Sequence, residues 1–308
     1  MQHKPGNNHW KQVFRHWQLY AFLVLPIVYF LIFRYTPLAG LQIAFRKYAA
    51  RGGIWDSQWV GLKNFQKFFE SYQFERVLAN TLRLSFYSLI ASFPLPIIFA
   101  LALNSMLNER YKKVLQLVTY APYFISTTVL VGMFMAVLNA RTGLYATVYS
   151  AIFNTYPSDL FADVNLFPHL YVWSGVWQNL GWDSIIYVAA LSSVPVELHE
   201  AAQIDGASRY QRVIHVDLPT ILPTASILLI LSFGSIMDIG FEKVFLMQNK
   251  INLRLSETIS TYVYKVGLTS GSDYSLSTAI GLFNSVVNLV LLLSVNTVTK
   301  KLSNTSLF

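Results

Sequence analysis

Cysteine is absent from this chain of 308 residues, and its absence excludes several kinds of site at once. Without a thiol there is no disulfide, no iron–sulfur cluster and no cysteine nucleophile. The sequence also lacks the Gly-x-x-x-x-Gly-Lys-Ser/Thr run that cradles phosphates and the Gly-x-Ser-x-Gly turn that presents a serine nucleophile. Any ATP held by such a loop must therefore be bound by another polypeptide.

Charged residues are also scarce. They make up 12% of the chain, whereas soluble globular proteins carry about 25%. Hydrophobic residues make up 54%, and the mean hydropathy is +0.43. The formal net charge is +8, but the basic residues are scattered over predicted loops, without the basic helix or aromatic motif of a nucleic-acid-binding domain. This composition predicts a membrane protein beside anionic lipid and argues against a nucleic-acid partner.

Six hydrophobic stretches approach the roughly 20 residues that a hydrocarbon core about 30 Å thick requires. They occupy residues 17–33 (which could continue to residue 45), 84–103, 114–138, 166–191, 222–239 and 276–298. The first stretch follows Lys4, Lys11 and Arg15, as a signal peptide would, but five further spans favour an uncleaved anchor. We therefore predict an all-α integral membrane protein with six transmembrane helices.

Basic residues in short loops predict the orientation of these helices. The N-terminal tail, the turn with Arg110, Lys112 and Lys113, and the pair Lys300–Lys301 would share the cytoplasmic side if both termini lie inside. The loop 46–83 holds seven basic residues and would lie outside, but long loops count little in this rule. We expect cytoplasmic termini. Residues 1–73 would form the tail, first helix and external segment, and residues 74–308 a core of five transmembrane helices.

The segment 195–223 is the most informative part of the chain. Pro195 suits the first turn of a helix, and Ala201 and Ala202 favour helix while leaving little bulk on its surface. Gly206 is placed to end that helix in a left-handed conformation. The pattern predicts a short polar helix whose small-residue face another surface could approach closely.

A second helix should follow the glycine. Ser208 and Gln211 have the spacing of a capping box, and we expect this helix to stop near Leu218–Pro219. The segment is therefore a helix–glycine–helix elbow between the fourth and fifth spans, polar enough to leave the bilayer. It could act as a lever between a soluble partner and the two spans, or it could be a surface loop that only joins them. The physics of these residues leaves both interpretations open.

The spacing within the elbow resembles a known signature. Glu200-Ala201-Ala202, three residues, Gly206, nine residues and then Val216-x-Leu218-Pro219 is similar to the EAA motif of permeases in binding-protein-dependent ABC importers, which usually has isoleucine where this chain has Val216. The resemblance implies that the elbow is cytoplasmic and that it contains the coupling helix that docks onto an ATPase subunit. The coupling residues would then be Glu200, Ala201, Ala202, Asp205, Gly206, Leu218 and Pro219.

Further similarities cover nearly the whole chain and point to sugar uptake. The chain resembles permeases for complex oligosaccharides and polysaccharide fragments in the maltose-permease-like class. The segments that carry this resemblance are residues 60–65, 80–81, 181–182, 240–246, 261–264 and 279–283. The resemblance implies a type I ABC importer permease in the bacterial cell membrane, paired with a second, similar permease as a heterodimer. It also implies an extracytoplasmic sugar-binding protein and two ATPase subunits that bind ATP and Mg²⁺. This chain itself would hold no cofactor and would work by alternating access.

Polar side chains inside apolar spans are costly and usually face a cavity or the bundle interior. Amides and carboxylates pair with sugar hydroxyls, and flat aromatic rings cover the apolar faces of a pyranose. The candidates for the substrate pathway are Trp177, Asn179, Trp182, Asp183, Asp238, Asn284 and Asn288. A structural interpretation stays open for them: asparagines also join helices, tryptophans also mark the membrane interface, and Asp183 could pair with Arg83.

Rival functions make other demands on the sequence. An ion-coupled secondary transporter would need buried carboxylates, for which Asp183 and Asp238 qualify. An intramembrane hydrolase would need a nucleophile and a base that no motif supplies. The run from His199 to Gln203 is one histidine short of a zinc-protease motif, so no metal site is expected. A permease of the same superfamily for a non-sugar solute stays an alternative, because the elbow alone does not name the substrate.

Overall fold

The computed structural model describes residues 16–49, 51–269 and 272–303. These residues form helices and their connecting loops, together with one two-stranded antiparallel hairpin. The basic residues of the predicted N-terminal tail, Lys4, Lys11 and Arg15, lie outside the described residues. The prediction of a mainly helical fold is confirmed, whereas the hairpin is a feature that the sequence patterns did not indicate.

In chain order, the first elements are α2 (Trp17–Phe30), β1 (Arg46–Ala49), β2 (Gly53–Trp59), α3 (Lys63–Phe69), α4 (Gln73–Ser92) and α5 (Pro94–Asn104). The middle of the chain forms α6 (Glu109–Tyr120), α7 (Thr127–Val137), α8 (Leu144–Phe153), α9 (Phe167–Leu191), α10 (Val196–Ile204) and α11 (Arg209–Arg212). The last elements are α12 (Leu218–Gly234), α13 (Phe241–Met247), α14 (Leu253–Ser256), α15 (Ile259–Tyr264) and α16 (Tyr274–Ser303).

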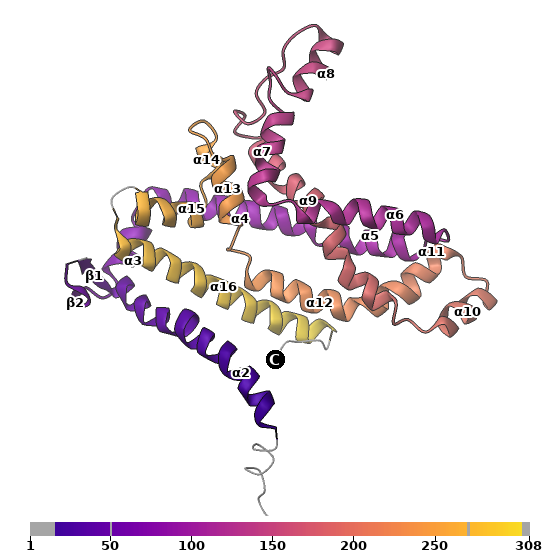
Figure 1. Cartoon of the computed structure of the whole chain (residues 1–308), viewed down its shortest axis with the longest axis horizontal. Helices are drawn as coiled ribbons and strands as arrows, with labels where there is room; N and C mark the ends of the chain where they lie inside the picture. The colour runs from indigo at the N-terminus through magenta and orange to yellow at the C-terminus, as the bar shows by residue number, and fades with distance from the viewer. Residues whose placement is uncertain (1–15, 50, 270–271, 304–308) are drawn as a thin grey trace, which may run out of the picture.

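The long helices run along the longest axis of the molecule (Figure 1). Within this bundle α9 packs against α4 and α5, and α12 packs against both α9 and α16. The helix α10 lies at one end of the bundle, and the hairpin lies with α3 and α15 at the other end. The predicted elbow and the predicted external segment therefore sit at opposite ends of the bundle.

Within the described ranges, four helices are long and apolar enough to cross a membrane, and the number is six if each of two bent pairs forms one span. The four are Trp17–Phe45, Gln73–Asn104, Arg209–Gly234 and Tyr274–Lys301. The fourth predicted span, 166–191, corresponds to α9 within one residue at its start. Counting apolar residues thus finds where the spans are, although it does not find every bend.

The third predicted span, 114–138, is wrong as a single helix. It is divided between Glu109–Phe124 and α7, which meet at an angle of 101°. Between them Ile125 is extended, and the Ser126 hydroxyl caps α7 by accepting a hydrogen bond from the Val129 N–H at 3.4 Å. A serine cap inside an apolar run redirects the chain while scarcely lowering its hydropathy, so the composition does not reveal the bend.

The fifth span also differs from the prediction. The expected stop at Leu218–Pro219 is wrong, because the helical path continues from Arg209 to Gly234. A π-helical turn, Val213–Asp217, places Pro219 in the first turn of α12, where its missing N–H costs little. The span therefore joins the elbow directly, and it ends at Gly234 rather than at residue 239.

The helix α2 stands away from the rest of the bundle over most of its length (Figure 1). None of its residues is buried, although nearly all are apolar. It continues through a π-helical turn into a 3₁₀ helix, Thr36–Phe45, and this later part packs against α16. A helix that is apolar and exposed on all sides suits contact with lipid or with another membrane subunit.

At the hairpin end of the bundle a buried carboxylate ties α4 to the start of α15. Glu257 pairs with Arg76 and with Lys265, whose Nζ lies 2.9 Å from Oε1. Asn80 strengthens the same junction by donating to the backbone oxygens of Arg254 and Glu257, each at 3.0 Å. The side chain of Glu257 is only 5% exposed, and the two cations offset the cost of burying a carboxylate there.

Replacing this carboxylate should weaken the fold. We expect Glu257→Ala to lower the free energy of unfolding by about 3 kcal/mol, because it leaves two cations beside an uncharged gap. Thermal unfolding of the detergent-purified protein measures the loss. As a control, Glu109→Ala removes an exposed partner of Lys112 at 3.8 Å and should cost less than about 1 kcal/mol. If both variants lose the same free energy of unfolding, the buried ion pairs of Glu257 stabilise the fold no more than the exposed pair of Glu109 does.

Candidate functional site: the elbow and the central cavity

The first half of the elbow has the predicted structure. Pro195 is the N-cap residue of α10, and Gly206 has a φ of +79°, a left-handed conformation that favours glycine. The Ala207 N–H donates to the Ala202 carbonyl at 2.9 Å, and the Gly206 N–H donates to the Gln203 carbonyl at 3.0 Å. Together these bonds form a Schellman motif, which satisfies carbonyls at the helix end. The predicted glycine stop is confirmed.

The second half begins with the predicted capping box. The Ser208 N–H donates to Gln211 Oε1 at 2.7 Å, and the Gln211 N–H donates back to Ser208 Oγ at 3.4 Å. A separate bend lies at the start of the elbow, where the helix axis turns by 76° between α9 and α10. The bend at the glycine and the start of α11 are therefore fixed by hydrogen bonds among neighbouring residues.

The elbow presents a surface that the described residues leave uncovered. Its exposed residues include Glu200, Ala201, Asp205, Gly206 and Pro219, while Ala202 and Leu218 are half-buried. Large apolar side chains are exposed beside them, with Ile204 at 86% and Tyr210 at 73%. Apolar side chains next to small residues form a surface suited to close contact with another protein.

A buried aspartate ties the elbow to the bundle. Asp217 is 3% exposed, and its Oδ1 lies 3.1 Å from His199 Nε2 on α10 and 3.4 Å from Asn104 Nδ2 at the end of α5. The carboxylate of Asp217 therefore connects α10, the π-helical turn before α12 and the end of α5. No sequence pattern predicts this link. An acidic residue two positions before Pro219 is its only local signal.

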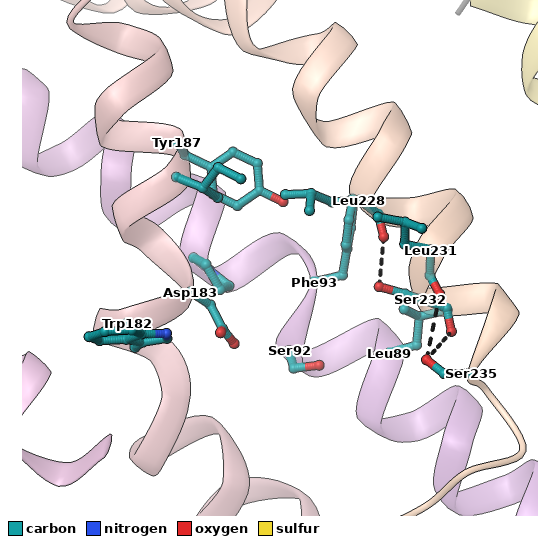
Figure 2. A pocket seen from close by; sticks show the side chains of 12 residues that line it. Leu89, Ser92, Phe93, Trp182, Asp183, Tyr187, Leu228, Leu231, Ser232 and Ser235 are labelled. Carbon is teal, nitrogen blue, oxygen red and sulfur yellow. Dashed lines mark hydrogen bonds between the residues drawn. The ribbon is translucent and has the colours of Figure 1, made fainter. Parts of the chain in front are cut away.

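A cavity of about 450 Å³ lies beyond the elbow, between α9, α12 and the junction of α4 with α5. Figure 2 shows Trp182, Asp183 and Tyr187 on its α9 wall and Leu228, Leu231 and Ser232 on its α12 wall. The side chains of Leu89, Ser92 and Phe93 close it from the third side. Two of the predicted pathway residues, Trp182 and Asp183, thus contribute to the lining of the same cavity.

Aromatic and charged groups lie next to each other on the α9 wall. The Trp182 ring is stacked flat on Tyr123, with 4.2 Å between the centroids and an interplanar angle of 2°. The carboxylate of Asp183 points into the cavity (Figure 2). Among the described residues it forms no ion pair within 4 Å, so the suggested pairing with Arg83 is not found. A free carboxylate beside an aromatic face is an arrangement that can hold a polyhydroxylated ring.

The other predicted pathway residues lie in different surroundings. Asn179 lines a smaller cavity of about 230 Å³ next to the first, and its Nδ2 donates to the Gly175 carbonyl at 2.9 Å. Trp177 lines a separate apolar cavity. The ring of Phe134 meets the Trp177 ring edge to face, with 5.9 Å between their centroids. The remaining three form a clamp, in which Asn284 and Asn288 donate to the two oxygens of Asp238 at 2.7 and 3.0 Å. Asn288 also accepts the Met237 N–H at 2.9 Å, so this group fastens α16 to the loop after α12.

Comparison with known proteins identifies the family of this chain. Residues 76–304 match the model of a family described as the binding-protein-dependent transport system inner membrane component. The chain belongs to this family. The permease shares 40% identity with Protein LplB of Bacillus subtilis (strain 168) over 290 residues, which cover 94% of this chain and 91% of LplB. It shares 37% identity with the polygalacturonan/rhamnogalacturonan transport system permease protein YteP of the same strain, over 94% of this chain and 90% of YteP.

Solved structures give the same answer for the fold. The permease matches a chain of a bacterial alginate ABC transporter in complex with an alginate pentasaccharide-bound periplasmic protein, with a TM-score of 0.88 and 37% identity. The match covers 98% of this permease and 100% of that chain. The protein is thus a membrane-spanning permease subunit with the type I ABC importer fold, a transport component rather than an enzyme.

Proposed function

We propose that this permease forms one half of an import pathway for an oligosaccharide or polysaccharide fragment, which an extracytoplasmic binding protein delivers. One observation carries the mechanism: the two helices that the elbow joins, α9 and α12, are also two walls of the central cavity. Displacement of α10 would therefore change the shape of the cavity directly. The sugar class is supported by relatives whose names concern polygalacturonan, rhamnogalacturonan and alginate.

The pathway needs partners that this chain does not supply. A second, similar but distinct permease would close the open side of the cavity and cover the exposed helix α2. Two ATPase subunits would bind ATP and Mg²⁺ and would receive the elbow at Glu200, Ala201 and Gly206. This arrangement makes the elbow end cytoplasmic. The end of α5 and the start of α11 line one cavity there, and the first turns of α6 carry the basic residues Arg110, Lys112 and Lys113.

The proposed transport cycle uses this geometry. ATP-driven closure of the ATPase dimer would move α10, rock α9 against α12 and open the cavity toward the binding protein. The sugar would enter the cavity that Trp182 and Asp183 line. ATP hydrolysis would then restore the state that opens to the cytoplasm, where both termini of this chain would lie. The reacting phosphate groups stay on the ATPase subunits throughout.

Uptake by intact cells tests the proposal. Deleting the gene should abolish uptake of labelled oligogalacturonides or alginate oligosaccharides, and restoring it should recover uptake only when the partner ATPase is active. The proposal is overturned if the deletion affects a non-sugar solute alone. Uptake that continues without ATP would overturn it as well, since it would indicate a gradient-driven carrier.

Asp183→Asn should reduce the transport of the sugar about tenfold. The amide keeps the size of the side chain but exchanges a charged acceptor for a neutral one, and a hydrogen bond to a charged group contributes about 1.5–3 kcal/mol. The concentration dependence of uptake in complemented cells measures the change. Asp56→Asn, at an exposed position in β2, is the matched control and should leave uptake unaltered. Unimpaired transport by Asp183→Asn would remove this residue from the pathway.

A further inference from the structure

A buried lysine lies beside the central cavity. Lys243 is on the short helix α13 and is 9% exposed. Its Nζ donates to the Tyr171 carbonyl at 2.9 Å and lies 4.9 Å from the centroid of the Tyr171 ring. In the sequence Lys243 stands out only as part of the segment 240–246, because nothing local marks it as buried.

A missing side chain lets the ammonium group reach α9. A Cβ added at Gly175 would lie 3.1 Å from Lys243 Nζ, so the glycine provides the space that the ammonium occupies. Lys243 thereby lines the 230 Å³ cavity together with Ser88, Gln178 and Asn179. This cavity shares Ser92, Pro96 and Asp183 with the larger one, so it is a side chamber of the same pathway.

The charge of Lys243 is not balanced locally. Among the described residues it forms no ion pair within 4 Å. Glu242, its neighbour in sequence, instead accepts a hydrogen bond from Thr128 Oγ1 at 2.8 Å. Burial lowers the pKa of Lys243 from 10.5 to about 8, which still leaves most of the group protonated at pH 7. A buried cation without a carboxylate partner is costly, so its presence calls for an anion that joins it.

We propose that Lys243 binds the carboxylate of an acidic sugar, a uronic acid residue of the transported chain, and so favours acidic over neutral oligosaccharides. The amides and serines of the side chamber would hold the hydroxyls of the same ring. Asp183, at the boundary with the larger cavity, would accept hydrogen bonds from hydroxyls of the same chain. This inference rests on the proposed sugar import and adds the residue that senses the charge of the sugar.

The alternative is a structural role, in which the lysine only packs its stem and covers the Tyr171 ring. The two roles differ in their dependence on substrate charge. A structural lysine would affect all substrates equally when replaced, whereas a carboxylate-binding lysine would affect the acidic form alone. A matched pair of substrates therefore separates the two roles.

The test compares uptake of labelled trigalacturonate and of its methyl ester by cells that carry the complete transporter. We expect Lys243→Met, which keeps an apolar stem of similar length, to reduce trigalacturonate uptake at least tenfold and to leave ester uptake unchanged. Lys243→Arg, which restores the positive charge, should recover acid uptake to within about threefold of wild type. Gly175→Ala, which displaces the ammonium without removing it, should also impair the acid more than the ester. Immunoblotting of membranes confirms equal amounts of each variant.

The possible contrary results are distinct. Equal loss of both sugars in Lys243→Met, or loss of neither, overturns the role of Lys243, as does a wild-type transporter that prefers the ester. The proposed function is overturned instead if the wild-type cells import neither sugar, or if their import does not depend on this gene. The first comparison involves the variants and the second involves the wild type only, so the two failures cannot be confused.

Discussion

Gly206→Val should almost abolish transport while the permease stays in the membrane. The position has a φ of +79°, and a left-handed conformation costs an ordinary residue roughly 1–2 kcal/mol. A β-branched side chain is worse still at such a position. The valine variant should therefore abandon the Schellman motif and redirect α11. Because the proposed docking surface includes residues on both sides of the bend, we expect uptake to fall at least tenfold and the ATPase to lose its response to the loaded binding protein.

The position itself provides the matched control. Asparagine tolerates the left-handed conformation, and a Cβ at this glycine would meet no atom within 4 Å in this chain. Gly206→Asn should therefore retain most of the uptake. Sugar uptake and ATP hydrolysis are measured in the same membranes, with the amount of permease determined by immunoblotting. Normal coupling in the valine variant would show that the shape of the elbow does not matter for transport.

Gly181→Ala should destabilise the fold by about 3 kcal/mol. In α9 a Cβ at this glycine would lie 2.3 Å from the Thr119 carbonyl oxygen and 2.8 Å from Cδ1 of Tyr120. The first of these atoms belongs to the backbone of α6, which cannot rotate away as a side chain can. The two helices must separate instead, and overpacking of this kind costs about 1–3 kcal/mol. The midpoint of thermal unfolding in detergent should fall accordingly.

Another helical glycine serves as the comparison. Gly281 lies in α16, and a Cβ there would meet nothing within 4 Å. Gly281→Ala should be neutral or stabilising by up to about 1 kcal/mol, because alanine favours helix more than glycine does. If Gly181→Ala unfolds no earlier than Gly281→Ala, the close approach of α6 and α9 is incorrect.

The elbow could be predicted in detail because its structure is local. Pro195, Gly206, Ser208 and Gln211 act on atoms within a few residues of themselves, so their order along the chain fixes the start of one helix, its end and the start of the next. The error at Pro219 has a similar local cause. A proline can stop a helix or stand in its first turn. Here the π-helical turn Val213–Asp217 places Pro219 in the first turn of α12.

The cavity could be predicted only in part. Asp183 and Trp182 were found because polar and aromatic groups inside a span are conspicuous, and both do face the cavity. The same reasoning selected Asn284 and Asn288, which hold Asp238 instead. Their residue types allow either role. The role depends on what the neighbouring helix brings opposite each side chain.

By itself, the sequence determined that this protein crosses a membrane, that it lacks a phosphate-binding loop and that a helix–glycine–helix elbow joins its fourth and fifth spans. Hydropathy, motif spacing and helix caps are properties of neighbouring residues. The tertiary structure alone decided that α9 and α12 line the cavity, that Asp217 ties the elbow to α5, and that Lys243 reaches the smaller cavity through the gap at Gly175. These facts depend on contacts between residues far apart in the chain, and such contacts arise only when the helices pack.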